Sequence, residues 1–110
     1  MDQELKDRWL AALKSGKYKK GMSALCSTRS DGNYYCCLGV LADLLVQDNK
    51  GTWVKRDDFC LSFVDKSGDK CAGLIPNKDI LSENTQWHLV RINDSSVGWV
   101  EVIREIEIKC

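Results

Sequence analysis

The segment from Cys36 to Gln47 constrains the fold more than any other part of this 110-residue chain. Its apolar residues fall on nearly every side of a helix, and Asp43 is the single charge in the run from Cys36 to Leu45. A helix that is hydrophobic all round has to be buried. The run is also much shorter than the ~20 apolar residues that cross a bilayer. It therefore predicts a central core helix and no membrane span, and Gly39 within it indicates close packing against a neighbouring segment.

Two further helices are expected on either side of this one in the sequence. The first covers residues 2–16, where Asp2 can cap the start, Gly16 can end the helix, and apolar residues recur at helical spacing. The second covers residues 99–107, whose apolar stripe follows possible caps at residues 93–96. Both helices are therefore expected to have one apolar face.

Short segments rich in β-branched and aromatic residues predict a small sheet. A hairpin is expected over residues 22–35, because Ser30-Asp31-Gly32 has turn chemistry, and further strands are expected over residues 52–55 and 59–64. The polar residues 82–85 are expected to form a loop, and residues 86–92 fit either a strand or a short helix. The chain is thus predicted to be one α+β domain over residues 1–110, with about three helices packed on a small, mainly antiparallel sheet.

Charge narrows the possible partners. The chain carries 16 basic and 16 acidic residues, and a net charge of zero argues against nucleic acid as the partner. Residues 1–30 are locally basic, however, with seven basic and three acidic side chains, so an anion can be attracted there. The N-terminus is charged from Asp2 onward, which is not the pattern of a secretory signal peptide. The expected location is therefore the cytoplasm.

The six cysteines are expected to be reduced, because a protein without a signal peptide stays in a reducing compartment. The sequence has one histidine and no Cys-x-x-Cys pair, so no metal site is predicted. It has no Walker-type or Rossmann glycine motif either, which argues against ATP or NAD as a cofactor. No cofactor is predicted.

Three stretches resemble a family of small, mostly uncharacterised phage and prophage proteins. The first is a tryptophan-bearing helix followed by Ser15-Gly16-Lys17-Tyr18-Lys19, and the second is Cys36-Cys37-Leu38-Gly39-Val40-Leu41. The third is a C-terminal Leu-x-x-Leu-Asn-Asp pattern, which is met here by Leu89, Ile92, Asn93 and Asp94. The resemblance implies an accessory protein that interferes with host machinery or host defence, working in the host cytoplasm.

The basic segment around Tyr18 is the first candidate site. Ammonium groups beside an aromatic ring can hold a phosphate and stack a base. Two tryptophans next to polar segments can add to such a pocket or to an interface. The alternative is a solvated loop whose lysines complement the dipole of the preceding helix. The candidate ligand-binding residues are Lys14, Lys17, Tyr18, Lys19, Lys20, Arg29, Trp53 and Trp87.

The adjacent cysteines are the second candidate site. Cys36 and Cys37 stand where the central helix is predicted to begin, and a helix N-terminus lowers the pKa of a thiol. With His88 downstream, this order is similar to that of papain-like cysteine hydrolases. The surrounding residues are so apolar that buried structural thiols are the preferred interpretation, with the three residues as catalytic candidates in an enzyme alternative.

These observations favour a binding protein over an enzyme. The expected function is to sequester a small anionic ligand, and in a phage setting the most economical target is a nucleotide second messenger of host defence. The alternative is a protein–protein inhibitor whose exposed aromatic residues cover a host protein. The small size is compatible with a homo-oligomer, whose order the sequence does not determine.

Overall fold

The computed structural model describes residues 1–71 and 73–110, with four helices and six strands. In chain order the elements are α1 (Gln3–Lys14), β1 (Lys19–Lys20), β2 (Cys26–Arg29), β3 (Gly32–Tyr35), α2 (Cys37–Gln47), β4 (Gly51–Lys55), β5 (Cys60–Asp65), β6 (Lys70–Cys71), α3 (Glu83–Ser95) and α4 (Val100–Lys109). The α+β class is confirmed. None of the helices among the described residues is long and apolar enough to cross a membrane.

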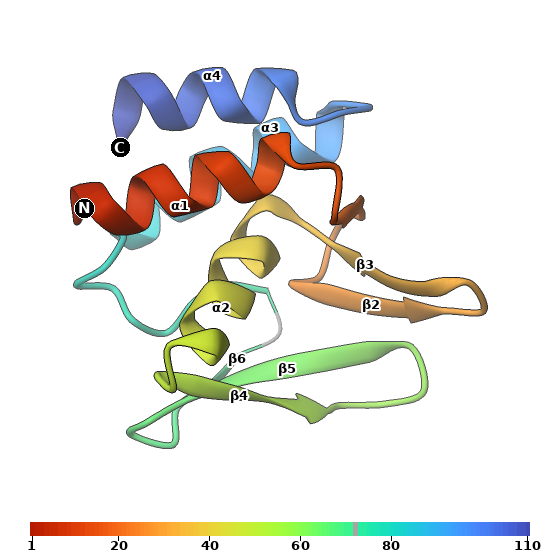
Figure 1. Ribbon diagram of the computed structural model, residues 1–110. Helices are drawn as coiled ribbons and strands as arrows, with labels where there is room; N and C mark the ends of the chain where they lie inside the picture. The colour runs from red at the N-terminus through yellow and green to blue at the C-terminus, as the bar shows by residue number, and fades with distance from the viewer. Residues whose placement is uncertain (72) are drawn as a thin grey trace.

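Helix α2 is the centre of the molecule, as its sequence predicts. Eight of its eleven residues are buried. Helices α1, α3 and α4 lie on one side of α2 and the sheet lies on the other (Figure 1). The indole of Trp9 in α1 is fully buried and donates to the carbonyl of Cys37 at 2.9 Å. The expectation of close packing at Gly39 is also confirmed, because an added Cβ would lie 1.7 Å from the carbonyl oxygen of Leu25.

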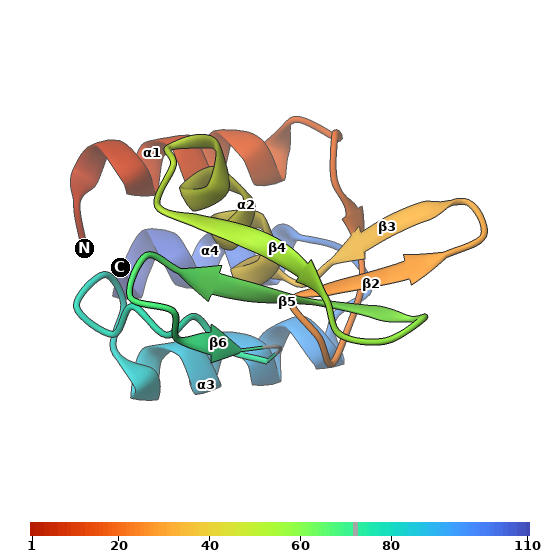
Figure 2. The same cartoon turned by 90° about the horizontal axis from the view of Figure 1, so that it is seen from below.

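The sheet runs in the order β1-β3-β2-β5-β4, and β6 pairs with β5 beyond the end of β2. All strand pairs are antiparallel except β1 with β3, so the prediction of a mainly antiparallel sheet is confirmed. Figure 2 shows β4 in front of α2 with α1 above it in the view, and β4 is an edge strand of the sheet. The predicted hairpin forms, but its first strand begins at Cys26 and not at residue 22, since Ser23 takes a positive φ of 70° that breaks the extended chain.

The C-terminal third differs most from expectation. Residues 86–92 belong to a helix, which raises the number of helices from three to four. The polar residues 82–85 are not a loop: Ser82 caps α3 by accepting from the amide of Thr85, and the next residues form its first turn. Residues 93–96 end α3 and do not cap α4, which starts at Val100 without a side-chain cap.

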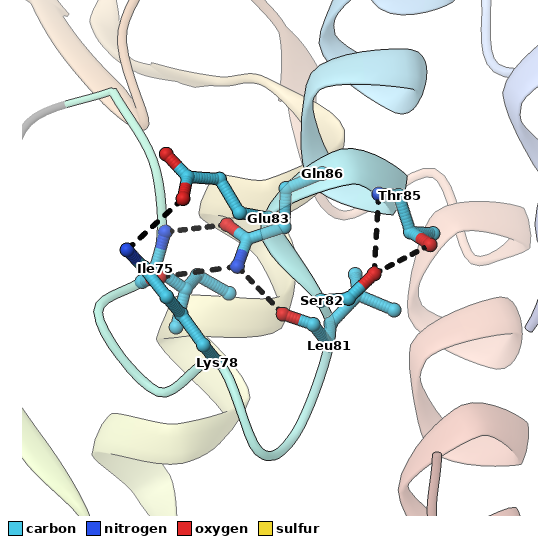
Figure 3. Close-up of polar contacts among 7 residues, drawn as sticks. All are labelled: Ile75, Lys78, Leu81, Ser82, Glu83, Thr85 and Gln86. Carbon is cyan, nitrogen blue, oxygen red and sulfur yellow. Dashed lines mark hydrogen bonds and ion pairs between the residues drawn. The ribbon is translucent and has the colours of Figure 1, made fainter.

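Gln86 explains why α3 takes this position. Its side chain is fully buried, accepts from the amide of Ile75 at 2.7 Å, and donates to the carbonyls of Ile75 and Leu81 (Figure 3). Buried main-chain groups need such partners, and here one amide side chain supplies three hydrogen bonds. These hydrogen bonds hold the segment before α3 against the helix. On the surface, the ion pair of Lys78 with Glu83 at 3.1 Å joins the same segment to the first turn of α3.

Candidate functional site

A groove of about 360 Å³ lies where α1 packs on α2, and the two helices cross in Figure 1. Its volume falls at the lower end of the range for ligand pockets, roughly 300–1,000 Å³. Ala11, Ala12 and Leu44 give it an apolar floor. The polar lining comes from both helices and from the segment after α1: Arg8, Ser15, Lys17, Tyr18 and Gln47.

The wall formed by Tyr18 is held by a carboxylate. The phenol of Tyr18 donates to Asp43 at 2.6 Å, and the amide of Gln47 donates to the same carboxylate oxygen at 3.3 Å. The indole of Trp53 donates to the other oxygen of Asp43 at 3.0 Å. Burial and the neighbouring Asp43 raise the pKa of Tyr18, so the phenol keeps its proton at neutral pH. Two predicted site residues, Tyr18 and Trp53, are thus brought together by a carboxylate between them.

Aromatic packing makes this wall rigid. The ring of Tyr35 lies 5.0 Å from that of Tyr18 and 6.2 Å from that of Trp53, and Phe63 follows at 6.0 Å from Trp53. All three contacts are edge-to-face, the arrangement that ring quadrupoles favour. Burial raises the pKa of Tyr35 to about 12, so this phenol is neutral as well. Tyr18, which lines the groove, is therefore held both by Asp43 and by the ring of Tyr35 behind it.

Lys17 is the predicted lysine that lines the groove, and its ammonium makes no ion pair within the described part of the chain. Lys14 lies 3.6 Å from Glu107 of α4. Lys19 donates to the carbonyl of Asp31 at 2.5 Å. Both are directed away from the groove by these contacts. The lysines of the basic segment thus contact different parts of the protein and do not form one cluster at the groove.

Lys20 has a structural partner as well. Its ammonium donates to the carbonyls of Asn93 and Ser96 at 2.6 and 2.7 Å and lies 5.9 Å from the ring of Trp99. These are carbonyls at the end of α3, where a positive charge complements the helix dipole. Next to it the fully buried Asn93 accepts from the amide of Cys37 and donates to the carbonyl of Gly21. Lys20 and Asn93 together join β1, α2 and α3.

The remaining predicted residues lie elsewhere. The guanidinium of Arg29 stacks 4.1 Å above the ring of Tyr34 on the β2–β3 hairpin. Trp87 is 52% exposed on α3 and does not line the groove. The groove in turn contains residues that the sequence analysis missed, Arg8 and Gln47, and it depends on Asp43. The signal for Asp43 was present, because it is the one charge in the apolar run of α2.

The cysteine pair lies inside the core. Cys36 is the N-cap of α2 and accepts from the amide of Gly39, yet it is only 4% exposed, and Cys37 is fully buried. Burial raises the pKa of Cys36 to about 11 and that of Cys37 well above its ordinary value. This rise outweighs the lowering of the thiol pKa that a helix N-terminus causes. His88 is on a helix and pairs with Glu105 of α4 at 2.8 Å. No hydrogen bond in the described ranges joins His88 to either thiol.

We expect slow alkylation of Cys36 and Cys37 in the folded protein near pH 7, because both thiols are buried and protonated. Labelling with iodoacetamide, followed by peptide mass spectrometry, should modify the partly exposed Cys60 and Cys71 first. Cys36 and Cys37 should react fully only after unfolding. Rapid, stoichiometric modification of either one, suppressed by His88→Ala, would contradict the burial argument and favour the hydrolase alternative.

All six cysteines are free in the described chain. No group of three or more His, Cys, Asp or Glu side chains that could hold a metal ion occurs in residues 1–71 and 73–110. A family model described as a domain of unknown function, DUF8296, matches residues 1–109. No curated protein and no solved structure matches the chain.

Proposed function

The chain belongs to the DUF8296 family, whose description assigns no activity, and we propose that it is a non-catalytic binding protein that holds a small anionic ligand in the α1–α2 groove. The observation that carries the proposal is the position of Lys17. Lys17 lines a groove with an apolar floor, and its ammonium lacks an ion pair among the described residues. An unpaired cation beside apolar surface suits a ligand with an anionic group and a flat body.

The hydrogen bonds in the groove support binding more than catalysis. The hydroxyl of Ser15 donates to the carbonyl of Ala12 at 2.6 Å, and the phenol of Tyr18 donates to Asp43. Both protons are thus committed to acceptors within the protein. The acceptor of Ser15 is a main-chain carbonyl, which cannot serve as a base, and the raised pKa of Tyr18 keeps its phenol protonated beside Asp43. Sequestration needs only affinity, and the ordered wall lowers the entropy lost on binding.

A second candidate function rests on exposed aromatic side chains away from the groove. Phe59 is 73% exposed at the β4–β5 turn and Trp87 is 52% exposed on α3. Aromatic residues at such exposure are frequent anchors of protein–protein interfaces. An inhibitor of a host protein would use these residues and leave the groove empty, so substitutions at Lys17 separate the two functions.

A thermal-shift screen of nucleotides tests the first function. The screen includes mononucleotides, cyclic di- and trinucleotides and ADP-ribose-type compounds, with isothermal titration calorimetry for any hit. A ligand at one hundred times its Kd stabilises the fold by about 2.7 kcal/mol and so raises Tm by several degrees. Lys17→Gln should reduce the shift to about half at the same ligand concentration, since a tenfold loss of affinity lowers the stabilisation to about 1.4 kcal/mol. Lys66→Gln, in the exposed β5–β6 turn, is the matched control and should keep it.

A flat screen, or a hit whose affinity is the same in Lys17→Gln, would overturn the proposal. Loss of binding to a purified host protein on Phe59→Ser or Trp87→Ser, combined with a flat screen, would favour the inhibitor function instead.

A further inference from the structure

The two ends of the groove differ in charge. Helix α1 lines the groove with Arg8, Ala11, Ala12 and Ser15, a stripe that spans roughly 10 Å at 1.5 Å per residue. Arg8 stands at one end of this stripe, and Lys17 follows its other end. A cation is therefore present at each end of the floor, but only one of the two is free to meet a ligand.

Arg8 is neutralised by Asp48, the residue after α2. The two guanidinium nitrogens donate to the two carboxylate oxygens at 2.7 and 3.1 Å, a bidentate pair. Each partner stabilises the charge of the other: the pair lowers the pKa of Asp48 and raises that of Arg8. An anion approaching Arg8 would also meet the carboxylate of Asp48, so this end of the groove offers no free positive charge to a second anionic group.

The surface beyond Arg8 strengthens this effect. A second hollow of about 390 Å³ begins there, with Arg8 and Lys50 as its cations and four carboxylates in its lining, those of Asp2, Glu4, Asp48 and Asp79. At the other end, Ser15 and Lys17 follow the C-terminus of α1, whose carbonyls carry a partial negative charge. Lys17 can offset one anion there, and the other cation that lines the described groove, Arg8, is already paired with Asp48.

From this layout we infer that the groove selects ligands with a single anionic group on a flat apolar body, such as a nucleoside monophosphate. The inference rests on the proposed function and narrows it. The anionic group lies at Lys17, and the ring system lies on Ala11, Ala12 and Leu44. Diphosphates and cyclic di- or trinucleotides carry further anionic groups that find no free positive charge at the Arg8–Asp48 end, and the groove volume is small for them.

Calorimetry with AMP, adenosine, ADP and cyclic di-AMP tests the inference at one fixed ionic strength. The wild-type protein should bind AMP most tightly. Adenosine should bind at least tenfold more weakly, because it lacks the charge-assisted contact. Lys17→Gln should weaken AMP binding by about the same factor and leave adenosine binding unchanged.

Asp48→Asn is the decisive variant, because it removes the carboxylate that occupies Arg8. The variant should bind ADP about tenfold more tightly than the wild type does, and at least as tightly as it binds AMP. Asp58→Asn, an exposed carboxylate on the β4–β5 turn, is the matched control and should change neither affinity. Circular dichroism confirms that each variant is folded.

Tighter binding of ADP or cyclic di-AMP than of AMP by the wild-type protein would overturn this inference and leave the proposed function standing. An unchanged ADP affinity in folded Asp48→Asn would also overturn it. Failure of all four compounds to bind would overturn both this inference and the proposed function on which it rests.

Discussion

Gly39→Ala is expected to prevent stable folding. An added Cβ would lie 1.7 Å from the carbonyl oxygen of Leu25 and 2.7 Å from its carbonyl carbon. Both atoms belong to the main chain, so no rotamer change relieves the overlap, and α2 would have to move away from the segment before β2. Such a shift separates the central helix from much of the core. The loss should exceed about 4 kcal/mol, a large part of the roughly 5–15 kcal/mol by which an ordinary domain is stable.

Urea denaturation followed by circular dichroism measures this loss. Gly98→Ala is the matched control, because nothing lies within 4 Å of its added Cβ and its φ is not left-handed. The free energy of unfolding of the control should lie within about 0.5 kcal/mol of the wild-type value, as it does for most surface substitutions. A Gly39→Ala protein with wild-type stability would show that α2 and the Leu25 carbonyl are not in close contact.

Asn93→Ala is expected to destabilise the protein by about 3 kcal/mol or more, since it leaves two buried main-chain groups without partners. The side chain accepts from the amide of Cys37 at 3.1 Å and donates to the carbonyl of Gly21 at 3.0 Å. The substitution also leaves a cavity where the amide was, which adds to the cost. Asn84→Ala, at an exposed position of the same helix, should cost far less.

Hydrogen exchange gives a local measurement for the same variant. The amide of Cys37 lies at the start of α2 and is protected through Asn93, so its exchange should accelerate more than that of amides in the middle of α2. A loss below about 0.5 kcal/mol, with the Cys37 amide still protected, would contradict the role given to Asn93.

The sequence predicts the parts of the fold whose pattern is local. Helix α2 is apolar on nearly all sides, and the β2–β3 hairpin has a turn at Ser30–Gly32, so both were expected. For residues 86–92 of α3 the sequence left a strand and a short helix open, because the buried positions of the helix include Gln86 and Asn93, two polar residues that weaken any apolar stripe. Their amides are buried because they bind main-chain groups of distant segments, and those partners come from the tertiary fold alone.

The candidate groove was predictable only in part, for the same reason. Lys17 and Tyr18 stand out in the sequence because a basic, aromatic segment follows a helix. Arg8 and Gln47 join them through the packing of α1 on α2. The sequence alone does not distinguish Lys17 from the other lysines of the segment. In the fold, Lys14 pairs with Glu107 and Lys19 donates to the carbonyl of Asp31.

The contacts of Lys20 can form only late in synthesis, after Asn93 and Ser96 have been made. Its carbonyl partners lie 73 and 76 residues further along the chain. While the ribosome is still making that later part, α2 has already emerged but lacks α3, which packs on one of its sides. The most apolar helix is thus left partly uncovered until α3 has been made. A nascent chain in this state presents the kind of transiently exposed apolar surface that chaperones bind, and slower translation prolongs the wait.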